Sequence, residues 1–194
     1  MEIIDNSTTE KTEESPGKTS RPKWGAVLVW VFVLGLLAVL GLGLVRSQKG
    51  TIGVGDRVPD LSLTTFEGDE IDFADLQGQI VVVNFWASWC TTCDQEAAEL
   101  EQAYQMYKDQ GVVFLGVDYV DTEAEALVYL AKFGITYPNG PDLGTRISQA
   151  FRIIGVPETY IIGPDGRLAA VKLGPYISLD EIVNQIETVM AEQK

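Results

Sequence analysis

The apolar positions of the chain form one long run near the N-terminus, followed by shorter segments that alternate with polar residues. Residues 24–45 contain no charged side chain over 22 positions. At about 1.5 Å per residue a helix of this length spans roughly 33 Å, enough for a hydrocarbon core of about 30 Å. Trp24 stands at one end, where an interfacial aromatic is favoured. The pattern predicts a transmembrane anchor over 24–45.

A cleaved signal peptide is the alternative interpretation of this run. Its apolar region is usually about 7–15 residues long and ends in an A-x-A-like site. Here the run is longer and the following L-G-L-V-R-S-Q has no such site, which favours an uncleaved anchor. Residues 1–23 are polar without apolar periodicity and predict a disordered tail. Residues 46–54 are interpreted as a tether, and residues 55–194 as one soluble domain.

The soluble domain shows several strand patterns. Apolar and polar positions alternate on both sides of 67–69, which is typical of a β-hairpin. Two continuous β-branched runs, 80–85 and 112–117, are typical of central strands buried on both faces. Further apolar stretches at 159–162 and 168–173 flank G-P-D-G and predict a second hairpin.

Helical spacing appears between these strands. It predicts helices over 93–110, 122–133 and 143–151, and a final helix over 178–192 that begins with a capping box of Ser178 and Glu181. Strands that alternate with helices predict an α/β fold whose sheet carries helices on both faces.

The composition excludes several kinds of site. The chain has no histidine, which removes Ser-His-Asp and Cys-His catalysis and His-ligated metals. Its two cysteines cannot complete a four-ligand zinc site of Cys and His, although a half-site completed by another chain stays open. No metal ligand is therefore predicted.

Charge is unevenly distributed along the chain. Residues 55–194 carry 23 acidic and 8 basic residues, a net charge of −15. Such a domain repels phosphates, so no nucleic acid partner is expected. The apolar run is directly preceded by Lys18, Arg21 and Lys23 and followed by Arg46 and Lys49, which weakly favours a cytoplasmic N-terminus.

Both cysteines stand in one short motif, W-A-S-W-C-T-T-C, directly after the strand at 80–85. The pattern puts Cys90 at or just before a helix N-terminus, where a thiolate is stabilised. Cys93 lies within reach, so the pair can alternate between dithiol and disulfide. A structural disulfide closing so small a loop would stabilise little. We interpret the pair as a redox-active disulfide that needs no other cofactor.

This motif resembles the active site of the thioredoxin superfamily. A second stretch, F-R-I-I-G-V-P-E-T-Y, resembles the loop in which that family holds a cis-proline facing its cysteines, here Val156-Pro157. The resemblance covers 55–194. It implies a thioredoxin-like fold, with a central mixed sheet, helices on both faces, an added N-terminal hairpin and a central insertion.

The branch of the superfamily can be narrowed. The hairpin, the anchor and 37 residues between Tyr119 and Pro157 together resemble the membrane-tethered, extracytoplasmic reductases of bacteria, including TlpA-like and ResA-like proteins. That resemblance implies a domain outside the cytoplasmic membrane. It also implies clients with disulfides, such as apocytochrome c, and a thiol-disulfide electron donor in the membrane. Val83 and Ala87 depart from the peroxidatic P-x-x-x-T/S-x-x-C pattern, which disfavours a peroxiredoxin.

Roles follow for the site residues. Cys90 is the predicted nucleophile and Cys93 the resolving thiol. Glu96 falls one helical turn after Cys93, where a carboxylate can handle the proton of exchange and where related reductases have a functional glutamate. The resemblance also implies a contribution from Glu158 in P-E-T. Trp89, Val156 and Pro157 are predicted to bind clients.

One residue departs from the thioredoxin pattern. Asn84 replaces the buried aspartate six positions before the nucleophile and cannot titrate. The prediction is a protein-disulfide reductase. A thiol oxidase or isomerase, or a non-enzymatic interaction module of the same fold, stays open as an alternative.

Overall fold

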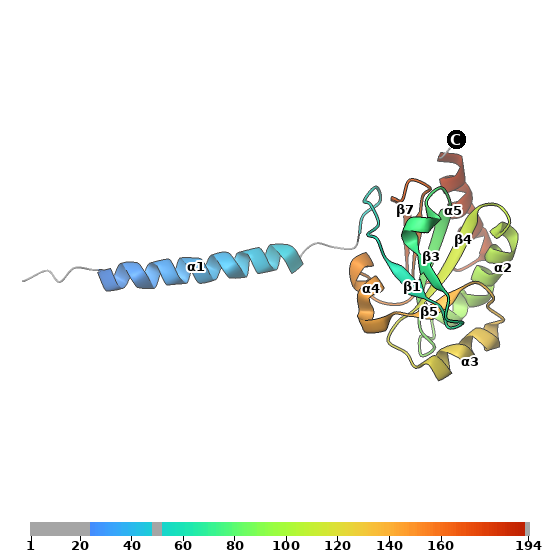
Figure 1. Ribbon diagram of the computed structural model, residues 1–194, viewed down its shortest axis with the longest axis horizontal. Helices are drawn as coiled ribbons and strands as arrows, with labels where there is room; N and C mark the ends of the chain where they lie inside the picture. The colour runs from blue at the N-terminus through green and yellow to red at the C-terminus, as the bar shows by residue number, and fades with distance from the viewer. Residues whose placement is uncertain (1–23, 48–51, 193–194) are drawn as a thin grey trace, which may run out of the picture. The chain divides into compact units, whose positions relative to one another are not determined.

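The computed structural model describes residues 24–47 and 52–192, and the chain divides into two compact units, 1–49 and 50–194. The predicted disordered tail, residues 1–23, lies outside the described residues. So do residues 48–51 of the predicted tether, together with 193–194. Figure 1 shows the helix of the first unit and the α/β body of the second.

The described part of the first unit is the helix α1 (Trp24–Ser47), which includes the whole predicted anchor. Its apolar side chains are exposed, among them Trp30, Phe32 and Leu40. Over the residues that the structure describes, no helix reaches the length and apolar character of a membrane span. The anchor over 24–45 stays a prediction.

The second unit is built on a five-stranded sheet of order β5-β4-β3-β6-β7. Strand β3 pairs in parallel with β4 and antiparallel with β6; β5 extends the parallel side and β7 the antiparallel side. The predicted mixed α/β sheet is therefore confirmed. The strands are β3 (Ile80–Trp86), β4 (Val112–Asp118), β5 (Asn139–Pro141), β6 (Glu158–Ile162) and β7 (Leu168–Leu173).

Every residue of β3 is buried, as its continuous apolar run predicted. Because successive side chains point to opposite faces, Val83 and Phe85 pack into one core with α4, whereas Ile80 and Val82 pack into another with α2 and α5. The helices are α2 (Ala97–Tyr107), α3 (Glu123–Phe133), α4 (Arg146–Phe151) and α5 (Leu179–Glu192).

The first predicted hairpin is present as β1 (Ser62–Thr64) and β2 (Glu70–Asp72), which pair antiparallel. It is fastened to the sheet at β5, where Phe66 N–H donates to the Asn139 carbonyl at 2.8 Å. The short helix η1 (Phe73–Leu76) follows it. Leu63 of β1 is fully buried, so the hairpin is part of the core.

Two predicted helices are interrupted. The helix predicted over 93–110 consists of a short 3-10 turn, η2 (Cys93–Gln95), and then α2, because Glu96 at the junction departs from ideal helical geometry with φ −111° and ψ −11°. The helix predicted over 143–151 divides into η3 (Leu143–Thr145) and α4, since Gly144 adopts φ +67°. The final helix begins where Ser178 predicted, with Ser178 Oγ accepting from Glu181 N–H at 3.3 Å.

Candidate redox site

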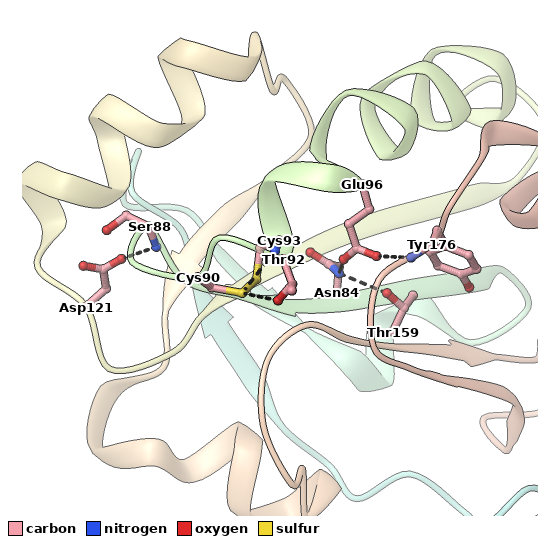
Figure 2. Close-up of a disulfide and its surroundings, with 9 residues drawn as sticks. All are labelled: Asn84, Ser88, Cys90, Thr92, Cys93, Glu96, Asp121, Thr159 and Tyr176. Atoms are coloured by element: carbon pink, nitrogen blue, oxygen red, sulfur yellow. Dashed lines mark hydrogen bonds between the residues drawn. A yellow bond between two sulfur atoms is a disulfide. The ribbon is translucent and has the colours of Figure 1, made fainter.

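Cys90 and Cys93 form a disulfide in the segment that leads from β3 to α2 (Figure 2). Their Cα atoms are 5.3 Å apart. Cys90 retains 6% of its surface and Cys93 only 1%. A client can therefore reach Cys90 more easily, which agrees with its predicted role as the nucleophile.

Cys90 lies just before the N-terminus of a helix, as predicted, but that helix is a short 3-10 turn. Cys90 precedes the 3-10 turn, and α2 itself begins only at Ala97. Two local groups contact its sulfur instead: Cys93 N–H donates to Sγ at 3.1 Å, and the Thr92 hydroxyl lies 3.3 Å from it (Figure 2). These contacts would stabilise a thiolate at Cys90 after reduction. The expected effect thus comes from neighbouring donors and not from a long helix.

Glu96 directly follows the 3-10 turn that begins at Cys93, and it is 1% exposed. Its Oε1 accepts from Asn84 Nδ2 at 2.8 Å, and its Oε2 accepts from Tyr176 N–H at 2.7 Å (Figure 2). Burial outweighs these two hydrogen bonds and raises the pKa of Glu96 to about 7. The structure therefore gives the site a carboxyl group that exchanges a proton near neutral pH.

Asn84 has a definite place in this arrangement. Its amide nitrogen also donates to Thr159 Oγ1 at 3.0 Å, so it links Glu96 to strand β6. Because β3 and β6 pair with Asn84 opposite Thr159, the link is fixed by strand register. Sequence reasoning noted that Asn84 cannot titrate, but it did not find that Asn84 orients Glu96.

The Val156–Pro157 peptide bond is cis, in the loop that enters β6. Val156 packs against the cluster that contains both cysteines. The Pro157 carbonyl accepts from Gly174 N–H at 3.0 Å. The structure thus brings Val156 beside the disulfide, as the sequence predicted; client binding by Val156 and Pro157 stays a prediction.

The Glu158 carboxyl group is held by the loop before Pro157 and by a neighbouring tyrosine. Its Oε1 accepts from the N–H groups of Ile154 and Gly155 at 2.8 and 3.0 Å, and its Oε2 from the Tyr160 hydroxyl at 2.6 Å. Strand alternation puts Glu158 and Thr159 on opposite faces of the sheet, and Thr159 is the one on the side of Glu96. The Glu158 carboxylate fastens the loop before Pro157, and a role in proton handling stays a prediction.

Of the two tryptophans in the motif, one lies at the surface and the other in the core. Trp89 is 58% exposed beside the disulfide segment, and its Nε1 donates to the Val120 carbonyl at 3.1 Å. Trp86 is buried, stacks on Tyr129, and donates to Asn139 Oδ1 at 2.8 Å. Trp89 is thus available to a client, whereas Trp86 is a core residue.

Two aspartates near the site, Asp118 and Asp121, were not predicted as site residues from the sequence. Asp118 ends β4 and is buried, and Asp121 Oδ2 accepts from Ser88 N–H at 2.6 Å (Figure 2). The signal was available, because the carboxyl ends of the neighbouring parallel strands β3 and β4 meet at one edge of the sheet. Over 24–47 and 52–192 no group of three or more acidic or cysteine side chains is arranged to hold a metal.

The sequence of this chain matches a known protein family. The model of the AhpC/TSA family matches residues 54–171, well over half of the chain. The chain belongs to the AhpC/TSA family. Within that family it has the C-x-x-C pair of a thiol-disulfide enzyme, and Val83 and Ala87 stand where a peroxidatic pattern requires Pro and Thr or Ser.

The relatives of this AhpC/TSA protein described next all carry the names of thiol-disulfide exchange proteins. It is 28% identical over 166 residues to the thiol-disulfide oxidoreductase ResA of Geobacillus kaustophilus, covering 84% of this chain and 95% of the relative. It is 25% identical to ResA of Oceanobacillus iheyensis over the full length of both chains. A solved thiol:disulfide interchange protein of the thioredoxin family from Chlorobium tepidum superimposes with a TM-score of 0.63 at 25% identity, over 69% of this chain and 94% of that one.

These findings confirm the predicted thioredoxin-like fold. Together with the Cys90–Cys93 disulfide, they identify the chain as a thiol-disulfide oxidoreductase, whose substrates are proteins that carry disulfides or thiols.

Proposed function

We propose that this oxidoreductase works as a reductant, transferring two electrons from its Cys90–Cys93 dithiol to disulfides of client proteins. The observation that carries thiol-disulfide exchange is the arrangement of the pair, whereas the direction of electron flow rests on the resemblance to reductases. Cys90 is the more accessible sulfur and has two contacts that favour a thiolate. Close by, the buried Glu96 has a pKa of about 7.

The exchange proceeds in two balanced steps. The Cys90 thiolate attacks one sulfur of the client disulfide, so that a mixed disulfide forms and the first client thiolate leaves. Cys93 then loses its proton and attacks the Cys90 sulfur, which releases the second client thiolate. The enzyme ends as the Cys90–Cys93 disulfide, and the client has gained two electrons and two protons.

Glu96 fits the proton step of this scheme. A thiol as buried as Cys93 is a poor nucleophile until its proton is removed. A carboxyl group with a pKa near the working pH serves equally as acceptor and donor. Glu96 N–H donates to the Cys93 carbonyl at 3.2 Å, so the carboxyl belongs to the same turn as the resolving cysteine.

The direction and the clients are inferred from resemblance. The relatives named ResA and the likeness to tethered extracytoplasmic reductases support disulfide reduction over oxidation or isomerisation. Oxidised C-x-x-C-H segments of apocytochrome c are the proposed clients. A membrane thiol-disulfide protein is the proposed source of electrons.

We also propose that the chain is tethered to a bacterial cell membrane through residues 24–45. The support is the sequence, with 22 consecutive uncharged residues, and disulfide chemistry is typical of the outer face of such membranes. The N-terminus would then be cytoplasmic and residues 55–194 extracytoplasmic. Sedimentation of the full chain with membranes, and digestion of residues 55–194 by protease added to spheroplasts, would support this; recovery in the soluble fraction would contradict it.

Trapping of the mixed disulfide tests the proposed function. In a Cys93→Ser variant, the Cys90 thiolate can attack a client but nothing resolves the product. Incubation with an oxidised C-x-x-C-H peptide should therefore give a stable adduct, whereas Cys90→Ser should give none. Equal adducts in both variants would contradict the assignment of the nucleophile. No adduct in either would favour an interaction module.

A further inference from the structure

The segment that leads into the disulfide is held by a second loop. Residues 119–122, which we call the clamp loop, connect β4 to α3. Three hydrogen bonds join the two segments: Tyr119 N–H to the Trp86 carbonyl at 2.8 Å, Ser88 N–H to Asp121 Oδ2 at 2.6 Å, and Trp89 Nε1 to the Val120 carbonyl at 3.1 Å. On the side of the disulfide these bonds involve Trp86, Ser88 and Trp89, so they end one residue before Cys90.

The clamp loop has an unusual backbone. Val120 adopts φ +50°, in the left-handed region that β-branched residues rarely occupy. Its side chain is exposed, so burial of the side chain does not explain the conformation. The conformation instead directs the Val120 carbonyl to the Trp89 indole. The loop is therefore held in a shape that serves the segment before Cys90.

A carboxyl pair forms the base of the clamp loop. Asp118 is 2% exposed, and its Oδ1 has no hydrogen-bond partner among the described residues. Its side chain lies within hydrogen-bonding reach of the Asp121 carboxyl. Two carboxylates can form such a bond only when one of them carries a proton. Burial, followed by the charge of Asp121 and this hydrogen bond, raises the pKa of Asp118 to about 8.

Other titratable groups on the neighbouring elements are engaged elsewhere. The Asp142 carboxylate after β5 accepts from two backbone N–H groups of α4. Glu125 in α3 accepts from the Thr122 hydroxyl. The Tyr129 ring of α3 stacks on Trp86 of β3. Asp121 remains as the charged side chain that acts directly on Asp118.

We propose that Asp118 and Asp121 are a positioning pair, which holds the segment before Cys90 through one shared proton and loosens it when that proton is lost. In the protonated state Asp118 donates to Asp121, and Asp121 accepts from Ser88 N–H. When both carboxyls are ionised, their repulsion moves Asp121 away and weakens that bond. The inference concerns the site of the proposed reductase, but the hold on Ser88 exists whatever the direction of electron flow.

The Ser88 amide reports on this pair directly. The test is a pH titration from 6 to 9.5 of the oxidised full chain, labelled with ¹⁵N-serine, in which no cysteine titrates. In the wild type the Ser88 amide resonance should shift with a midpoint near pH 8. Asp118→Asn should abolish this shift, because the amide still donates to Asp121 but cannot ionise. Asp121→Asn should move the midpoint to lower pH, because Asp118 then faces a neutral partner.

A matched control separates this effect from general charge. Asp94→Asn removes one negative charge from the 3-10 turn, where Asp94 is paired with Lys132 and lies outside the clamp loop. It should leave the Ser88 midpoint unchanged. A Ser88 resonance that does not titrate in the wild type, or that titrates alike in Asp118→Asn, would overturn the proposal. A far-UV circular dichroism spectrum checks that each variant is folded.

The consequence for the site is measured separately. The measurement is the rate at which a phosphine reduces the Cys90–Cys93 disulfide of the wild type and of Asp118→Asn at each pH. The ratio of the two rates is used, because the titration of the phosphine affects both equally. The ratio should change by about threefold between pH 7 and 9, the size expected for one hydrogen bond. A constant ratio beside a titrating Ser88 would overturn the link to Cys90. Failure of client trapping alone would concern only the proposed function.

Discussion

At the residue scale, two buried glutamates show how surroundings decide chemistry. Glu96 and Glu158 are both nearly inaccessible, and both were predicted to act at the site. Glu158 accepts three hydrogen bonds and fastens a loop. Glu96 accepts two and is desolvated enough for its pKa to rise to about 7. That pKa suits the Glu96 carboxyl to exchange a proton near neutral pH.

Glu96→Gln should slow disulfide exchange and remove its titration near pH 7. Gln can still accept a hydrogen bond but cannot take up the Cys93 proton, so we expect a loss of at least about tenfold. The measurement is the pH dependence of the rate of client reduction by the full chain. Glu99→Gln, one turn further along α2 and of the same charge, is the control. An unchanged profile in Glu96→Gln would contradict the proton role.

At the element scale, the predictions succeeded wherever one element alone determines the pattern. The spacing of neighbouring residues alone predicts the buried run of β3, the hairpin of β1 and β2, and the cap of α5. Strand β5 was missed because Asn139–Pro141 has no apolar alternation. It becomes a strand because it pairs with β4 on one side and accepts a hydrogen bond from Phe66 of the hairpin turn on the other. The pairings of Asn84 with Glu96 and of Ser88 with Asp121 depend likewise on distant segments, which a sequence does not place.

Gly116 marks the point where β4 approaches β5. A Cβ there would lie 1.6 Å from Asn139 Oδ1 and 2.9 Å from Trp86 Nε1, which breaks the hydrogen bond between them. Gly116→Ala should therefore lower the free energy of unfolding by about 2–3 kcal/mol. Denaturant unfolding measures this. Gly155→Ala, where a Cβ meets nothing within 4 Å, should cost less than about 1 kcal/mol; equal losses would contradict the packing argument.

At the scale of the whole molecule, stability should fall as the pH rises. Folding raises the pKa of Glu96 from 4.5 to about 7 and that of Asp118 from 3.8 to about 8. Between these limits the folded state binds more protons than the unfolded state, so the free energy of unfolding decreases with pH and levels off above about 8. The net charge of −14 acts in the same direction through self-repulsion.

The contribution of Glu96 can be isolated. The raised pKa of Glu96 lowers the free energy of unfolding by about 3 kcal/mol between pH 4.5 and 7. Glu96→Gln should remove this part of the decrease with pH. Denaturant unfolding of the wild type and of Glu96→Gln at pH 5 and 8.5 measures the difference. Wild-type stability that increases over this range would contradict the raised pKa values.

The proposed flow of electrons, from the Cys90–Cys93 dithiol to client disulfides, depends on the reduction potential of the pair. Equilibration of the full chain in thiol redox buffers at pH 7, with quantification of the Cys90–Cys93 disulfide, gives the reduction potential. We expect a value of about −220 mV or lower, in the range of glutaredoxins and thioredoxin. A value near about −120 mV, that of a strong oxidant, would contradict the proposed flow and indicate an enzyme that introduces disulfides.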